Sequence, residues 1–145
     1  MKKLVLPDSL LTGHAGIDAE HNKLVGLINT CMDAVEREDE GREEKIKTAL
    51  LELANELRRH FKREEKIMEG LGYKNMKKHR NHHNKTLEDF DKISDVISNE
   101  ALPIEWALHT IIHSFISDVV VPDFNFKNYL IEIDYRGLPE IDHKG

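Results

Sequence analysis

The residues best suited to do chemistry begin with one pair, His60 and Glu64. Side chains four residues apart lie on the same face of an α-helix, because four steps of 100° nearly complete a turn. That face also carries the apolar residues Ile46, Leu50, Leu53 and Leu57. The pair is therefore expected to point into a core, where a carboxylate needs a partner. A metal ion is one of the few partners that suffice.

Matching residues stand on the apolar stripes of the other predicted helices. The further candidate ligands, one or two from each helix, are His21, His79, His83, His113 and Asp118. A lone pair of histidines four residues apart in a charged helix is usually a solvated face. Here two pairs with this spacing and several single residues fall on inward faces of successive helices. Several independent accidents would be needed to produce that pattern.

Imidazole and carboxylate groups suit iron, zinc, manganese or copper. Five histidines and two carboxylates exceed the four ligands of a structural zinc site. They suit two octahedral ions, with three histidines on one ion and two on the other, which leaves a vacancy. A carboxylate has two separate donor oxygens, so Glu64 and Asp118 are the candidate bridges. Asp118 lies about 140° round the helix from His113, so both reach one site only if that helix is distorted or ends there.

Four amphipathic helices must position these residues. We expect them at about residues 18–38, 42–69, 75–98 and 103–121, with Asp18 as a helix cap and Pro122 as a stop or kink. Short connections favour an all-α, up-down-up-down four-helix bundle. The chain is expected to be a single domain, 1–145, with a core at about 16–120, an N-terminal arm at 1–15 and a C-terminal extension at 121–145. The extension should pack back as a short helix or arm, with little order from Gly137.

Composition narrows the classes of partner. Charged residues make up 33% of the chain, hydrophobic residues 39%, and the net charge is −6. No long basic run is present, which argues against nucleic acid and anionic membranes. No apolar run reaches the roughly 18 residues of a membrane span, and the N-terminal run is too short for a signal peptide, so a cytoplasmic location is expected. The single Cys31 excludes an internal disulfide and a cysteine-rich metal site.

The ordered set of motifs resembles the hemerythrin family, and specifically its single-domain bacterial members. The matching strings are GIDAEH at 16–21, HF with EE and M at 60–68, GY at 72–73 ahead of HxxxH at 79–83, and HxxxxD at 113–118. The resemblance covers roughly residues 16–120, and each of the seven family ligand positions has a matching residue.

This resemblance implies a non-haem di-iron centre (Fe²⁺/Fe³⁺) with a bridging oxo or hydroxo group. By carry-over, Glu64 and Asp118 would bridge the irons. His21 and His60 would hold the iron that binds dioxygen. The other iron would be saturated by His79, His83 and His113. The implied partner is dioxygen or another small diatomic or peroxide ligand.

The sequence departs from the family pattern near the expected pocket. His109 stands where tryptophan is common, Thr110 where leucine is common, and Thr86 where phenylalanine is common, with Trp106 three residues before His109. If these side chains face the site, the pocket is more polar than usual. His109 is then a candidate proton donor, although a packing role is slightly favoured.

These observations leave several functions open. The first is reversible dioxygen binding for storage, delivery or sensing. The second is a di-iron redox enzyme that reduces peroxide, oxygen or nitric oxide in the more polar pocket. The oxygen-activating di-iron carboxylate proteins carry Glu-x-x-His motifs on their helices, and the predicted helices of this chain contain none, which argues against it. Metal handling is a third possibility. A metal-free interaction bundle is the weakest, because Glu64 would be buried without a partner.

Overall fold

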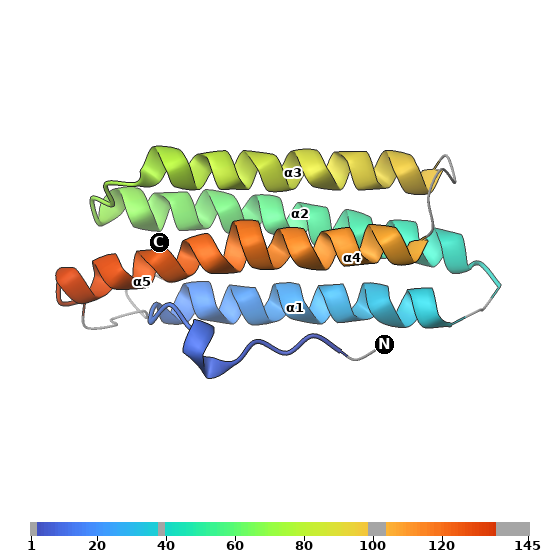
Figure 1. The fold of residues 1–145 in the computed structure, drawn as a ribbon, viewed down its shortest axis with the longest axis horizontal. Coiled ribbons are helices and arrows are strands. Elements are labelled where there is room, and N and C mark those ends of the chain that lie inside the picture. Colours follow the sequence, from blue (N-terminus) through green and yellow to red (C-terminus); the bar gives the residue numbers. More distant parts are fainter. Residues whose placement is uncertain (1–2, 38–39, 99–103, 136–145) are drawn as a thin grey trace.

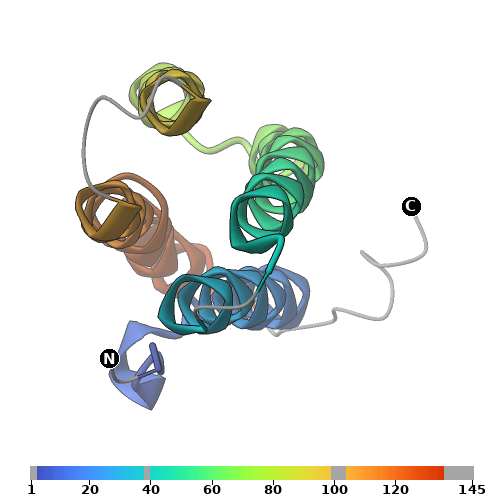
Figure 2. The ribbon, with the colours of Figure 1, turned by 90° about the vertical axis from the view of Figure 1, so that its right-hand side faces the viewer.

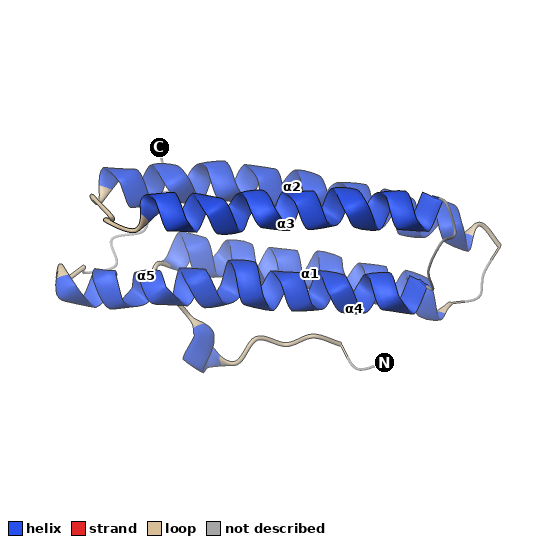
Figure 3. Cartoon of the chain, turned by 45° about the horizontal axis from the view of Figure 1, so that its top comes forward, coloured by secondary structure: helices blue, strands red, loops and turns tan. Residues whose placement is uncertain are grey.

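A computed structural model of the chain describes residues 3–37, 40–98 and 104–135. Its helices are η1 (Asp8–Leu10), α1 (Ala15–Glu36), α2 (Arg42–Gly70), α3 (Met76–Ser98), α4 (Ile104–Phe115), η2 (Ile116–Val120) and α5 (Val121–Glu132). Within these residues there is no β-strand (Figure 3). The predicted connections at Asp39 and 99–103, the helix start at Pro103, and the tail from Gly137 lie outside the described residues.

The long helices form an up-down-up-down four-helix bundle, which confirms the predicted fold class. Helices α1, α2 and α3 run in alternating directions, and α4, η2 and α5 follow one another as the fourth rod (Figure 1). Viewed along the length of the bundle, the helices surround a common centre (Figure 2). No helix in the described ranges has the length and apolar character that crossing a membrane requires.

Each helix buries one stripe of side chains, as the spacing of apolar residues predicted. The largest cluster includes Leu24, Leu57 and Phe115. A smaller one, near the other end of the bundle, consists of Ile17, Met68, Tyr73, Phe126 and Leu130. Along α1 and α2, the candidate ligands His21 and Glu64 each lie between a member of one cluster and a member of the other. The fold therefore places a buried polar layer between two hydrophobic layers.

The fourth rod contains a π-helical turn, η2, and does not end at Pro122. The amide of Val121 donates to the carbonyl of Ile116, five residues earlier. Pro122 lacks an N–H group, but it lies in the first turn of α5, where this is tolerated. Of the two expectations for Pro122, a stop or a kink, the stop is therefore wrong, and the irregular turn lies just before that residue. Helix α5 continues the bundle to Glu132 and does not pack back as a separate segment.

The N-terminal arm is fixed to α1 by side-chain hydrogen bonds. The Asn29 side chain accepts from the Leu4 amide and donates to the Leu4 carbonyl. The first helix begins at Ala15, and the His14 ring accepts the amide of Ile17 as its cap. The prediction that Asp18 caps this helix is wrong, because its carboxylate instead accepts hydrogen bonds from the preceding loop.

Candidate metal centre

Six buried residues from four helices converge in the polar layer of the bundle. Their potential ligand atoms form two groups, each with all its atoms within 4.8 Å of one another. The first group is His21, His60, Glu64 and Asp123, and the second is Glu64, His79, His83 and Asp123. Both groups contain the same two carboxylates, so Glu64 and Asp123 lie between one pair of histidines and the other.

The two oxygens of each carboxylate face different histidines. Glu64 Oε2 lies 2.9 Å from His60 Nε2, while Glu64 Oε1 lies 2.6 Å from His79 Nε2. Asp123 Oδ2 lies 2.5 Å from His21 Nε2, while Asp123 Oδ1 lies 2.7 Å from His79 Nε2. This is the arrangement of two carboxylates that each span a pair of metal positions.

Three of these buried atoms have no hydrogen-bond partner among the described residues, namely His60 Nε2, Glu64 Oε2 and Asp123 Oδ1. Two of them, on His60 and Glu64, are 2.9 Å apart, yet they lack hydrogen-bonding geometry. Buried polar atoms left in this way are costly unless something else satisfies them. Neutral imidazole nitrogens and carboxylate oxygens that converge without bonding one another fit a cation between them.

A second set of carboxylates holds the histidine rings from behind. His60 Nδ1 lies 2.7 Å from Glu20 Oε1, and His83 Nδ1 lies 2.8 Å from Glu65 Oε2. A proton on Nδ1 that is donated to a carboxylate leaves Nε2 free to bind metal. Sequence reasoning assigned no role to Glu20 and Glu65. The signal was their position next to His21 and Glu64 in the motifs.

The close pairing of these groups shifts their proton affinities. Burial alone lowers the pKa of His79, but the close carboxylates of Asp123 and Glu64 outweigh burial and raise that pKa to about 10. The pKa of His60 is also raised, because the Glu64 charge and the surrounding carboxylates outweigh burial. The pKa of Glu64 is lowered, since the effect of burial is overcome by His60 and its other partners. Without metal, the cluster therefore retains protons that a cation would displace.

The structure brings five of the seven predicted ligand residues together, and these are His21, His60, Glu64, His79 and His83. It does not bring His113 or Asp118 to them. His113 is exposed on α4. Asp118 is buried, but its carboxylate lies 3.1 Å from His82 Nδ1 and 3.0 Å from Lys85 Nζ.

The angular offset between these two residues explains why they cannot both reach the cluster. His113 and Asp118 do not share a helix face, because five residues turn an α-helix well past one revolution. Asp123 stands five residues after Asp118 and was missed, because the HxxxxD pattern had already been matched at 113–118. Its one visible signal was an aspartate that precedes the apolar Phe124 and Phe126.

Each polar residue expected near the pocket is either exposed or hydrogen-bonded to a backbone carbonyl. His109 is exposed, and the Thr110 hydroxyl donates to the Trp106 carbonyl. Thr86 is fully buried, but its hydroxyl donates to the His82 carbonyl. The expected polar pocket is therefore not formed by His109 and Thr110.

Aromatic rings cover two of the clustered histidines. Phe61 stacks on His83 with ring centroids 3.9 Å apart, and Phe115 packs edge-on against His21 at 6.3 Å. Both phenylalanines are almost fully buried. The sides of the cluster near these histidines are therefore apolar.

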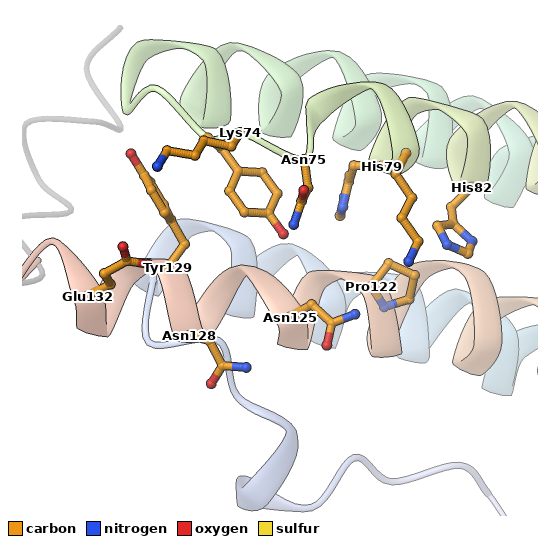
Figure 4. Close-up of a pocket in the computed structure, with 11 residues that line it drawn as sticks. Lys74, Asn75, His79, His82, Pro122, Asn125, Asn128, Tyr129 and Glu132 are labelled. Carbon is orange, nitrogen blue, oxygen red and sulfur yellow. The ribbon is translucent and has the colours of Figure 1, made fainter.

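A polar cavity of about 400 Å³ lies on another side of the cluster. It is formed between α5 and the start of α3 with the loop before it, and His79 is part of its wall (Figure 4). His79 is only 3% exposed, so its ring separates the cavity from the carboxylates behind it.

A bundle that buries four histidines around two shared carboxylates has the architecture of a metal-binding four-helix protein. The family model for the hemerythrin HHE cation-binding domain matches residues 12–120. The chain therefore belongs to the hemerythrin family. Comparisons with curated proteins and with solved structures gave no match. The family match ends just before Asp123, which the structure adds to the cluster.

Proposed function

We propose that this protein binds dioxygen reversibly at a pair of iron ions with a bridging oxo or hydroxo group. The proposed ligands are His21, His60, Glu64, His79, His83 and Asp123. The observation that carries the proposal is that the two groups of donor atoms share both carboxylates. Asp123 thus takes the bridging role that the sequence assigned to Asp118, and the three-plus-two division of histidines becomes two plus two.

The chain's own residues have separate tasks at this centre. Four protein residues at each metal position leave open places in an octahedral shell. Glu20 and Glu65 orient the rings of His60 and His83. Phe61 and Phe115 exclude water from the sides that they cover. Bound ferrous ions would supply the electrons and the open position that dioxygen binding needs.

The test is the metal content together with the visible spectrum of reduced protein, before and after exposure to oxygen. The proposal predicts two irons per chain, as the two groups of donors imply, and a charge-transfer band that disappears when oxygen is removed. Protein that contains a single zinc, or no metal after iron loading, would contradict it. We place this activity in the cytoplasm, as the composition predicts.

A redox enzyme that reduces peroxide, oxygen or nitric oxide is the second candidate. The polar cavity beside His79 favours it, because polar substrates have a place to collect near the centre. Steady consumption of peroxide by iron-loaded protein with a reductant, at a rate far above that of free iron, would support this candidate. A stable oxygenated form that consumes no reductant would exclude it.

A further inference from the structure

The cavity beside His79 differs chemically from the other surroundings of the cluster. Asn75, Asn125 and Asn128 line it, and the figure shows Asn75 and Asn125 on opposite sides, while the Asn128 side chain points away from them (Figure 4). Each amide offers two N–H donors. On the sides of His83 and His21, by contrast, the neighbours are Phe61 and Phe115. Of these three sides of the cluster, the His79 side is the one that offers hydrogen-bond donors to a polar ligand.

The charge of the cavity wall is opposite to that of the whole protein. Lys74 and Lys78 both line it, and Glu132 is the one carboxylate in its lining. Neither lysine has an ion pair with any residue in the described ranges. The chain as a whole carries a net charge of −6. Two unpaired ammonium groups at a concave site concentrate anions there, because field lines focus in clefts.

The ring of His79 is what separates the cavity from the proposed metal centre. The Nε2 atom of His79 lies 2.6 Å from Glu64 and 2.7 Å from Asp123, and its ring borders the cavity. A volume of about 400 Å³ holds a small anion together with water. The size of the cavity, the charge of its wall and its hydrogen-bond donors therefore all favour a small anion as the occupant.

We propose that this cavity collects small inorganic anions and is the route by which they reach the metal centre. The inference rests on the proposed di-iron site, and it concerns the path by which charged ligands reach that site. Neutral dioxygen gains nothing from the lysines, so its association is independent of them.

The experiment follows azide binding to the oxidised, iron-loaded protein by stopped-flow absorbance. The test variant is Lys74→Glu/Lys78→Glu. The matched control is Lys77→Glu/Lys92→Glu, which makes the same change of net charge at exposed lysines of α3 outside the cavity. We expect the association rate of azide to fall roughly tenfold or more in the test variant at low salt. The control should change it less than threefold, and dioxygen association with the reduced protein should be unchanged in both.

A second variant tests the route without using charge. Asn125→Trp places an indole in the cavity, and it should slow azide association even at about 1 M salt, where exposed charges are screened. The inference would be overturned if the association rate of azide fell equally in the test and control double variants. It would also be overturned if that rate fell neither in the test variant nor in Asn125→Trp. Azide association would then still report an intact iron centre. Failure of the wild-type protein to bind iron would instead remove the proposed function itself.

Discussion

At the scale of single residues, the carboxylates behind the histidines decide which ring nitrogen faces the metal. The carboxylate of Glu20 is hydrogen-bonded to His60 Nδ1 and also forms an ion pair with Arg63 at 2.6 Å. The carboxylate of Glu65 is hydrogen-bonded to His83 Nδ1 and forms an ion pair with Arg80 at 2.9 Å. Each glutamate is thus fixed by an arginine on its outer side. The orientation of the two rings depends on a chain of contacts that reaches the surface.

Replacing Glu20 should weaken metal binding without unfolding the bundle. We expect Glu20→Gln to lower metal affinity by about 10–100-fold, because the ring of His60 loses its charged acceptor. Competition with a chelator of known affinity measures the change. Glu69→Gln is the matched control, since Glu69 is exposed on α2 and its carboxylate has only one ion pair among the described residues, with Arg80 at 3.6 Å. Equal affinities for the two variants would show that Glu20 has no orienting role.

The raised pKa of His79 gives the metal-free protein a defined dependence on pH. This pKa is about 10 when folded, against an ordinary value of 6.5. The folded state therefore binds a proton more tightly than the unfolded state, and the resulting stability is fully present below pH 6.5. It is lost as pH rises through about 10. Urea unfolding of the metal-free protein should show a free energy that falls across this window, and a rise there would contradict the assignment.

At the scale of elements, regular helices were predictable and the irregular one was not. The pairs His60/Glu64 and His79/His83 each lie within one unbroken α-helix, so a step of four residues placed them correctly. The fourth rod contains the π-helical turn η2, where a constant 100° step no longer holds. Neither its presence nor its position follows from the local sequence, because it depends on packing as well as on Pro122. Asp123 lies beyond that turn, so a constant step from His113 could not have corrected the match made at 113–118.

The N-terminal arm should contribute to stability and not to metal binding. Asn29→Ala removes both hydrogen bonds to Leu4 and should lower the free energy of unfolding by about 1–3 kcal/mol. Metal content should stay unchanged. Denaturant unfolding and metal analysis of the same sample check both statements. Asn55→Ala is the control, because Asn55 is exposed and contacts only Arg58 at 3.4 Å. A loss of metal in Asn29→Ala would show that the arm supports the site.

At the scale of the whole molecule, the bundle was predictable because α1, α2, α3 and α4 each carry an apolar stripe. The continuation of the fourth rod to Glu132 was not, since α5 has no strong division into apolar and polar faces. Its buried residues include Asp123, Phe126 and Leu130, while Ile131 and Ile133 are exposed. The residues beyond Pro122 thus complete both the polar layer and the smaller hydrophobic cluster.

Removing the metal should destabilise the entire bundle, because carboxylates and imidazoles would remain buried without their cation. A ligand present at 100 times its Kd stabilises the folded state by about 2.7 kcal/mol. For a domain of this size we expect the Tm to fall by roughly 10 °C when a chelator removes the metal. Calorimetry before removal, after removal and after iron is restored measures the effect. A Tm that does not respond to metal would mean that the polar layer is satisfied without it.

The most direct test of this account compares the iron content of two variants, Asp123→Ala and Asp118→Ala. Both remove a buried carboxylate from the same rod, but only Asp123 belongs to the two groups of donor atoms. We predict that Asp118→Ala retains two irons per chain, like the wild-type protein, and that Asp123→Ala loses most of its iron. Retention of both irons by Asp123→Ala, with their loss from Asp118→Ala, would contradict the centre described here.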